Sequence, residues 1–311
     1  MLKQKDLYLK KFDGFSLYLD NKDPGISKTL KDPKLFKKWH REPEFMDIME
    51  SEVSIGDIAF DLGANIGYAT MHLAKFVGPS GKVYAVEPSP RNFEMLSESI
   101  KINGWEDRIE ASPIGISDRS GTEQLHLSEA SNLNSFKKTK HSQHCIDIQI
   151  ASIDDFFRDR SFPNFIKMDI EGAEVKALAG MKEILEKEDS PMKILMEIHP
   201  MYYKADEFAI QLRRMFGYGF KTKYLVSAGI ARPDYFVKHG YQPKKIYCTG
   251  DQTRGVYEGI SEEHVVESCS NMFEDHEYSL PWRQIIKRPY RIFNRTIASP
   301  KIVRSILLER S

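Results

Sequence analysis

The sequence predicts an α/β fold with a mostly parallel sheet, helices on both faces and additional segments at both ends of the chain. From about Ile58 onward, short β-branched apolar runs alternate with amphipathic helical stretches, the pattern of parallel strands joined by crossover helices. A glycine-containing turn follows the first strand, and an acidic residue closes the second. Both features predict a ligand site at the carboxyl ends of the strands.

The first four elements of this body form a β-α-β-α unit. Ile58–Phe60 and Val83–Val86 are short apolar runs typical of buried strands. The helix between them covers Tyr68–Phe76. Ser89-Pro90 supplies an N-cap and a first-turn proline for the next helix, which ends at Asn103-Gly104.

The rest of the body continues the alternation. Gln124–Leu127 and Ile146–Ile150 alternate polar and apolar residues, as an antiparallel pair with one solvated face would. Lys221–Val226 and Lys245–Cys248 are the candidates that complete the sheet. The other predicted elements are strands over Ile109–Ile116, Phe165–Ile170 and Ile194–Ile198, helices over Val175–Leu185 and Glu207–Phe216, and a short helix capped by Ser152.

The composition is that of a soluble protein with a sizeable core. Of 311 residues, 41% are hydrophobic and 29% charged, which suits one main domain with terminal additions. Lys plus Arg and Asp plus Glu both total 45, so the net charge gives no global argument for nucleic acid. Cys145, Cys248 and Cys269 form no CxxC pair, which argues against a zinc knuckle or a disulfide framework.

The chain shows neither a signal-peptide core nor a membrane span. The N-terminus is too polar for the former, and no segment reaches the roughly 20 apolar residues of the latter. We therefore expect a cytoplasmic enzyme.

Three regions are expected along the chain: an N-terminal cap or extension (1–50), the main domain (51–250) and a C-terminal extension (251–311). The last region is acidic and then basic. Asp251–Leu280 holds eight acidic residues against one Arg, and Trp282–Ser311 holds eight Lys or Arg against one Glu. The opposite charges can neutralise each other within a monomer or across a homo-oligomer.

The turn at Asp61–Gly67 lies between the first strand and the first helix. Glycines there let a ligand approach the backbone closely. A dinucleotide site favours G-x-G-x-x-G around a pyrophosphate, whereas this turn is G-x-x-x-G preceded by an acid. A carboxylate suits a ligand with an ammonium group and repels pyrophosphate. Glu87 closes the second strand, in the right place to accept hydrogen bonds from two ribose hydroxyls.

These motifs resemble the FkbM family of methyltransferases. The family signature has the form D-x-G-A-N-x-G, then V-x-x-x-E-P, then K-x-D-x-E-G-x-E, and it is matched by Asp61–Gly67, Val83–Pro88 and Lys167–Glu174. The resemblance covers about Ile58 to Cys248. It implies a Rossmann-like class I methyltransferase with a seven-stranded sheet whose final strand is antiparallel. It also implies S-adenosylmethionine as methyl donor and, usually, O-methylation of a sugar, polyketide or related small-molecule hydroxyl.

The resemblance assigns cofactor contacts by position. Glu87 would bind the ribose, and Ser117 and Asp118 would border the adenine. Asp118 is equally typical of a turn before Arg119-Ser120-Gly121. The residues that would hold the methionine part are Asp61, Gly63, Asn65 and Gly67.

Two strand ends carry the candidate catalytic residues. Lys167, Asp169 and Glu171 alternate along one strand and therefore face one side. Glu197 and His199 repeat the arrangement at the end of the next strand. His199 is the first candidate for a general base because its ordinary pKa is near neutral, and a capping or core histidine is an equally good interpretation.

The other members of this group have secondary roles. Asp169 is a second candidate base or a contact to the amino group of the cofactor, and Glu197 could orient the base or bind an acceptor hydroxyl. For Lys167, an ion pair with Asp169 or Glu197 is favoured over direct catalysis. Asp169, Glu171 and Glu197 could hold a divalent metal, which the sequence does not require.

The working hypothesis is an O-methyltransferase for a small-molecule or glycan hydroxyl. The basic C-terminal segment with Trp282, Tyr290 and Phe293 raises a rival, an RNA ribose methyltransferase. A third hypothesis is a non-catalytic S-adenosylmethionine-binding scaffold. Family members commonly border the acceptor site with the polar stretch that here holds Asn132, Asn134 and Ser135, for which loop solvation is the alternative.

Overall fold

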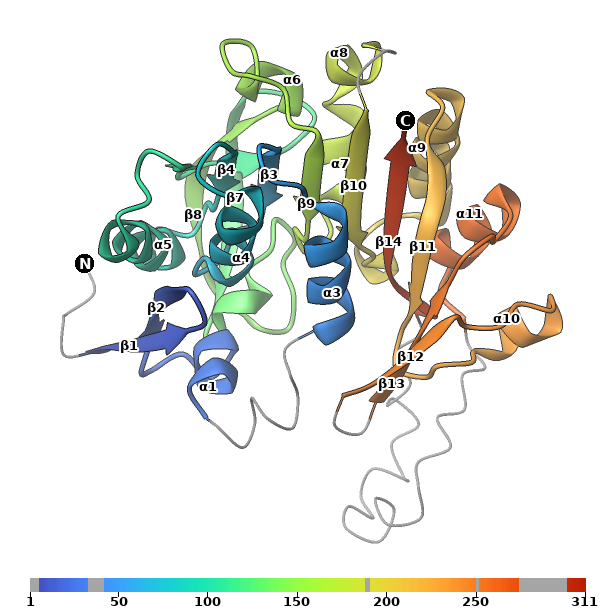
Figure 1. Ribbon diagram of the computed structural model, residues 1–311, viewed down its shortest axis with the longest axis horizontal. Helices are drawn as coiled ribbons and strands as arrows, with labels where there is room; N and C mark the ends of the chain where they lie inside the picture. Colours follow the sequence, from blue (N-terminus) through green and yellow to red (C-terminus); the bar gives the residue numbers. More distant parts are fainter. Residues whose placement is uncertain (1–5, 33–41, 188–190, 250–251, 274–300) are drawn as a thin grey trace, which may run out of the picture.

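A nine-stranded sheet forms the centre of the computed structural model, which describes residues 6–32, 42–187, 191–249, 252–273 and 301–311 (Figure 1). In spatial order its strands are β12 (Lys245–Thr249), β13 (Gln252–Tyr257), β11 (Lys221–Ser227), β14 (Val303–Arg310), β10 (Met192–Glu197), β9 (Phe165–Met168), β3 (Ile58–Leu62), β4 (Lys82–Val86) and β5 (Ile109–Ser112).

The strands from β5 to β10 are parallel, whereas β14 is antiparallel to both β10 and β11. The predicted α/β fold is therefore confirmed, including a seven-stranded section that runs from β5 to β11. Two further strands, β13 and β12, extend the sheet beyond β11 through antiparallel pairing. The sheet is consequently mixed and wider than the sequence indicated.

Helices cover both faces of the sheet (Figure 1). Alternate strand residues separate two apolar cores: Ala59 and Leu195 belong to one, Phe60 and Met196 to the other. No helix in the described part of the chain is long and apolar enough to cross a bilayer. The first face carries α3 (Pro43–Glu52), α4 (Tyr68–Val77) and α5 (Pro90–Asn103); the second carries α6 (Ile153–Phe156), α7 (Glu174–Ala179), α8 (Lys182–Leu185), α9 (Ala205–Gly217), α10 (Asp234–Lys238) and α11 (Glu262–Ser270).

A second sheet lies beside the carboxyl end of β5. It contains β6 (Gly115–Ile116), β8 (Ser142–Ala151) and β7 (Gly121–Ser128), and the predicted antiparallel pair corresponds to β7 and β8. The single strand expected over Ile109–Ile116 was wrong. It divides at Pro113, which has no N–H to donate to a ladder, and β6 then joins the second sheet.

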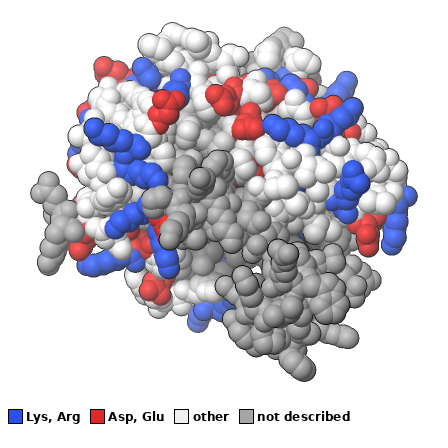
Figure 2. Space-filling model, turned by 60° about the horizontal axis from the view of Figure 1, so that its bottom comes forward, with Lys and Arg blue, Asp and Glu red and all other residues white. Residues whose placement is uncertain are grey.

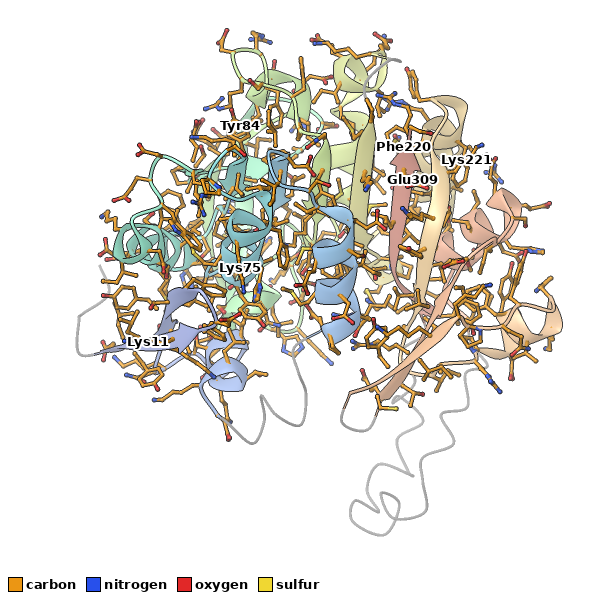
Figure 3. The ribbon with its side chains drawn as sticks, viewed as in Figure 1. Lys11, Lys75, Tyr84, Phe220, Lys221 and Glu309 are labelled. Atoms are coloured by element: carbon orange, nitrogen blue, oxygen red, sulfur yellow. The ribbon has the colours of Figure 1, made fainter. Side chains whose placement is uncertain are left out.

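The described part of the N-terminal region is a hairpin, β1 (Leu7–Phe12) and β2 (Phe15–Asp20), followed by α1 (Ile26–Lys31). The hairpin packs on α5, where the side chain of Asn103 accepts a hydrogen bond from Ser16 N at 2.8 Å. Lys75 of α4, labelled in Figure 3, pairs with Asp13 of the hairpin turn at 2.7 Å. This region therefore covers the first face of the sheet.

The expected boundary at residue 250 does not separate the sheet from an extension. Both β13 and α11 follow it, and β14 lies between β10 and β11 inside the sheet. Lys221 of β11 is the register partner of Glu309 of β14, and both residues are labelled in Figure 3. The sequence did not indicate β14, because its basic residues suggested an exposed segment. Lys301, Arg304 and Arg310 are instead largely buried and bind acidic side chains or backbone carbonyls inside the protein. Trp282, Tyr290 and Phe293 lie outside the described residues.

Candidate active site

Two adjoining cavities lie at the carboxyl ends of β3, β4, β9 and β10. The first cavity measures about 60 Å³ and the second about 290 Å³. They share part of their walls, so a ligand that fills one would contact a ligand in the other. The shared residues are Gly63, Asn65, Asn132, Asp169 and Glu171.

The predicted glycine turn forms one wall of both cavities. Gly63 has φ +75°, and a Cβ at this position would collide with the backbone carbonyl of Asp169. Asn65 is also left-handed, at φ 53°. Gly67 lines neither cavity; at φ +97° it begins α4 and packs against Leu96. Glycine is therefore required at Gly63 to keep β3 and β9 close together.

Asp61 lies beneath the turn and lines neither cavity. The side chain is fully buried, accepts a hydrogen bond from Thr70 at 2.6 Å and pairs with Lys167 at 2.9 Å. The Nζ of Lys167 also donates to the carbonyl of Gly63 at 3.0 Å. The predicted ion pair of Lys167 is thus made with Asp61, not with Asp169 or Glu197. In this geometry the carboxylate of Asp61 positions Lys167 and the turn. The predicted direct contact between Asp61 and the ammonium group of a ligand does not fit this arrangement.

Glu87 lines the first cavity, as expected for a residue that binds ribose. One carboxylate oxygen accepts from Ser89 N at 2.9 Å and the other from Asn65 N at 2.8 Å. Burial raises the pKa of Glu87 to about 7, although these hydrogen bonds and one from Asn92 oppose the rise. The carboxylate is therefore held in one orientation at the mouth of the turn.

The expected adenine contacts of Ser117 and Asp118 do not fit the structure. Neither residue lines the cavities. Asp118 is exposed and pairs with Arg119 at 3.0 Å, which is the turn interpretation of this residue. The first cavity has an apolar wall instead, formed by Ile114, Ile116, Leu125 and Phe136.

The polar stretch after β7 also contributes to the first cavity. Asn132, Asn134 and Ser135 all line it, and only Asn132 reaches the second cavity as well. Ser135 donates to the carbonyl of Glu171 at 3.0 Å, which ties this stretch to the end of β9. Loop solvation therefore does not describe these residues.

Several of the candidate catalytic residues lie together at the ends of β9 and β10. His199 is buried, and its Nδ1 lies 2.8 Å from a carboxylate oxygen of Glu174. Its Nε2 faces Glu197 at 3.5 Å, Glu171 at 3.6 Å and Asp169 at 4.0 Å. Glu174 belongs to the third sequence motif but carried no predicted role.

These carboxylates determine the charge of the imidazole. Burial alone would lower the pKa of His199, but Glu174 and Glu197 outweigh it and raise the pKa well above 6.5. Burial likewise opposes ionisation of Glu197, yet Arg304 and Lys301 hold the pKa of that carboxyl well below its usual range. His199 is consequently protonated at neutral pH. It cannot then accept a proton, so the prediction of His199 as general base does not fit this geometry.

Asp169 and Glu171 are the acids exposed to both cavities. Burial and the charge of Glu197 raise the pKa of Asp169 to about 6, against the opposing effects of Lys167 and His199. Burial raises the pKa of Glu171 to about 8, with His199 opposing and Asp169 adding to the rise. Asp169 is therefore the group most easily ionised at neutral pH that still meets both cavities.

The second cavity recruits residues from both ends of the chain. Glu42, Phe45 and Met46, at the start of α3, form one side, and Arg304 of β14 forms another. Arg304 bridges Glu42 at 2.6 Å and Glu197 at 3.1 Å. Sequence reasoning missed these residues, because nothing local connects a helix near residue 43 to a strand near residue 304.

Comparison with known proteins assigns the family. The family model of the methyltransferase FkbM domain matches residues 61–222, which are 162 of the 311 residues. The chain belongs to the FkbM methyltransferase family. The family predicted from three motifs is thus confirmed, and with it the presence of a methyltransferase domain of the expected class.

Two curated methyltransferases align with part of the chain. Hexuronic acid methyltransferase AglP from Haloferax volcanii is 27% identical over 164 residues, 51% of this chain and 62% of AglP. Methyltransferase sdnD from Sordaria araneosa is 25% identical over 156 residues, 40% of this chain and 60% of its own length. The chain therefore spans less than two thirds of the length of either relative.

The solved structures include a methyltransferase FkbM from Methylobacillus flagellatus KT. It covers 76% of this chain and 56% of its own, with 18% identity and a TM-score of 0.43.

Proposed function

We propose that this FkbM-family protein is an S-adenosylmethionine-dependent O-methyltransferase that acts on a hydroxyl of a sugar, glycan or similarly polar small molecule. The observation that carries the proposal is the common wall of the two cavities, formed by Gly63, Asn65, Asn132, Asp169 and Glu171. A donor in the first cavity and an acceptor in the second would meet at this wall, and placing two reactants together supplies much of the acceleration of a transfer reaction.

The first cavity has the chemistry of a nucleoside site. Glu87 presents a carboxylate that can accept hydrogen bonds from ribose hydroxyls, and Ile116 and Phe136 offer an apolar surface for the adenine. Gly63 and Asn65 leave the backbone accessible to the methionine part. We therefore assign the nucleoside end of the methyl donor to this cavity, which measures about 60 Å³ and would have to widen to admit it.

The second cavity suits a polar acceptor of limited size. Its volume of about 290 Å³ exceeds the roughly 60 Å³ of the first cavity. Glu42, Lys167, Glu197 and Arg304 line it with charged groups that can bind hydroxyls. The relative AglP is named for methylation of a hexuronic acid, which supports a sugar-like acceptor.

The transfer needs little beyond positioning and a route for one proton. The acceptor oxygen attacks the methyl carbon of the sulfonium, and the carbon–sulfur bond breaks with its electron pair moving to sulfur. The hydroxyl proton passes to Asp169, whose carboxylate meets both cavities. The imidazolium of His199 keeps the neighbouring carboxylates together, so we assign it a positioning role.

The RNA hypothesis is weakened by the fate of the basic segment. Lys301, Arg304 and Arg310 supply three of its eight cations, and all three are paired inside the protein. On the face shown in Figure 2, the described Lys and Arg side chains are interspersed with Asp and Glu. A surface of mixed charge is a poor counterpart for a phosphate backbone.

Two measurements test the proposal. Calorimetry with S-adenosylmethionine should show binding to the full chain, and an absence of binding at millimolar cofactor would remove every methyl-donor hypothesis. Transfer of a labelled methyl group should then be screened against sugars, glycolipid precursors and RNA. We expect product with a sugar-class acceptor. Label in RNA alone would establish the rival, and cofactor binding with no transfer to any acceptor would favour the scaffold.

A further inference from the structure

The end of β9 and the end of β10 contain a cluster that can hold an ion. We propose that Asp169, Glu171 and His199 bind one divalent cation at the wall between the two cavities. One ligand atom from each residue lies within 4.8 Å of the others. Two ligands that are each about 2.1 Å from an ion can be at most about 4.2 Å apart. The distances from His199 Nε2 to Glu171, 3.6 Å, and to Asp169, 4.0 Å, satisfy this limit, and the third separation, which is at most 4.8 Å, would have to shorten by at most about 0.6 Å on binding.

The histidine is oriented as metal-binding histidines are. The side chain of His199 is only 6% exposed, and its Nδ1 is held at 2.8 Å by the fully buried Glu174. A carboxylate on one ring nitrogen fixes the ring so that the other nitrogen can bind a metal. That other nitrogen, Nε2, points at three carboxylates, with Glu197 at 3.5 Å, Glu171 at 3.6 Å and Asp169 at 4.0 Å. The ion would therefore replace the proton that Nε2 carries in the metal-free protein, and the proton would be released to water.

The charges around the cluster leave room for a dication. Lys301 and Arg304 pair with Glu197, and Lys167 pairs with Asp61. Among the described residues, the ion-pair partner of Asp169 and of Glu171 is His199 alone. The second carboxylate oxygen of Glu174 is buried and has no hydrogen-bond partner among the residues that the structure describes. Two carboxylates and an imidazole are ligands that suit a first-row divalent ion such as Mn²⁺.

The position of the cluster gives the ion a task, which rests on the proposed function. Asp169 and Glu171 line both cavities, so open coordination positions would face the acceptor. A hydroxyl bound to a dication loses its proton more readily. In this form the proton passes to water, because Asp169 is occupied as a ligand. The oxygen then forms its bond to the methyl carbon, and the carbon–sulfur bond breaks with its electrons moving to sulfur.

The test is direct binding of Mn²⁺ to the full chain after EDTA treatment, followed through the electron paramagnetic resonance signal of the free ion. We expect one ion per chain. Asp169→Asn and Glu171→Gln should each weaken binding at least about tenfold, equivalent to about 1.4 kcal/mol. Glu183→Gln, which removes an exposed carboxylate on α8, is the matched control and should bind as the parent does.

The outcomes separate this inference from the proposed function. Calorimetry with S-adenosylmethionine in EDTA reports the donor site independently of any metal. Donor binding without stoichiometric Mn²⁺ binding overturns the metal site and leaves the methyltransferase proposal intact. Parent-like Mn²⁺ affinity in both variants also overturns it. Circular dichroism identifies a variant that fails to fold, and the other variant then decides the result.

Discussion

The two cavities differ in how much of the chain is needed to build them. The first is lined by residues between Gly63 and Glu171, most of them from segments that follow β3, β4, β5, β7 and β9. The second draws on residues from Ile26 to Arg304, including a helix before the first strand of the main domain and the last strand of the sheet. A site made by the turns at strand ends can therefore be identified from sequence motifs, whereas a site completed by distant parts of the chain cannot.

The largest expected effect is on the free energy of unfolding, and it concerns the buried ion pair between Lys167 and Asp61 beneath the glycine turn. Lys167→Met leaves the buried carboxylate of Asp61 without its cation, and breaking a buried pair costs about 3–5 kcal/mol of unfolding free energy. Denaturant titration measures the loss. Lys75→Met is the control, because its pair with Asp13 is exposed to solvent and should contribute little to stability. Equal losses in the two variants would show that the Asp61 pair does not support the turn.

The next effect should be confined to the first cavity. Glu87→Gln replaces a carboxylate whose hydrogen bonds to a ligand would contribute about 1.5–3 kcal/mol each, so donor affinity should fall roughly 10- to 150-fold. Calorimetry with S-adenosylmethionine measures it. Glu98→Gln, an exposed residue on α5, should leave the affinity unchanged. An unaltered dissociation constant for Glu87→Gln would place the ribose elsewhere.

The same residue predicts a pH dependence. Burial raises the pKa of Glu87 to about 7, whereas ribose hydroxyls require the ionised carboxylate. Below pH 7 donor binding must displace a proton, so the dissociation constant should rise by about tenfold per pH unit on further acidification. Above pH 8 this dependence should disappear. Calorimetry between pH 5.5 and 8.5 checks it, and Glu87→Gln should abolish this part of the slope if Glu87 is its source.

A smaller effect should be confined to the second cavity. Arg304→Lys keeps the charge but removes the planar fork that joins Glu42 to Glu197, so the acceptor KM should rise by roughly three- to tenfold. Donor affinity should stay within about twofold, a change of under about 0.5 kcal/mol. Arg310→Lys in the same strand is the control, because Arg310 donates to the carbonyls of Leu185 and Lys187. A matching loss of donor affinity would contradict the separation of the two cavities.

Sequence reasoning succeeded where the constraint acts over a few residues. The turn at Gly63 must adopt a left-handed backbone beside Asp169, and only glycine meets that need. Glu87 follows a strand that ends beside the same turn, so its place in the first cavity also followed from local order. Sequence reasoning failed for Asp118. The position of this residue in the family pattern suggested a contact with adenine, whereas the residue lies in a turn and pairs with Arg119.

The sequence by itself determined three features: the alternation of strands and helices, the glycine turn, and the acid at the end of the second strand. Each of them depends on local backbone geometry and on the periodic burial of side chains. The tertiary structure alone decided three other features. It inserted β14 between β10 and β11, paired Asp61 with Lys167, and surrounded His199 with carboxylates that keep it protonated. Each of these depends on which distant segment fills a buried place, because the energy of a buried charge is set by partners that sequence order does not reveal.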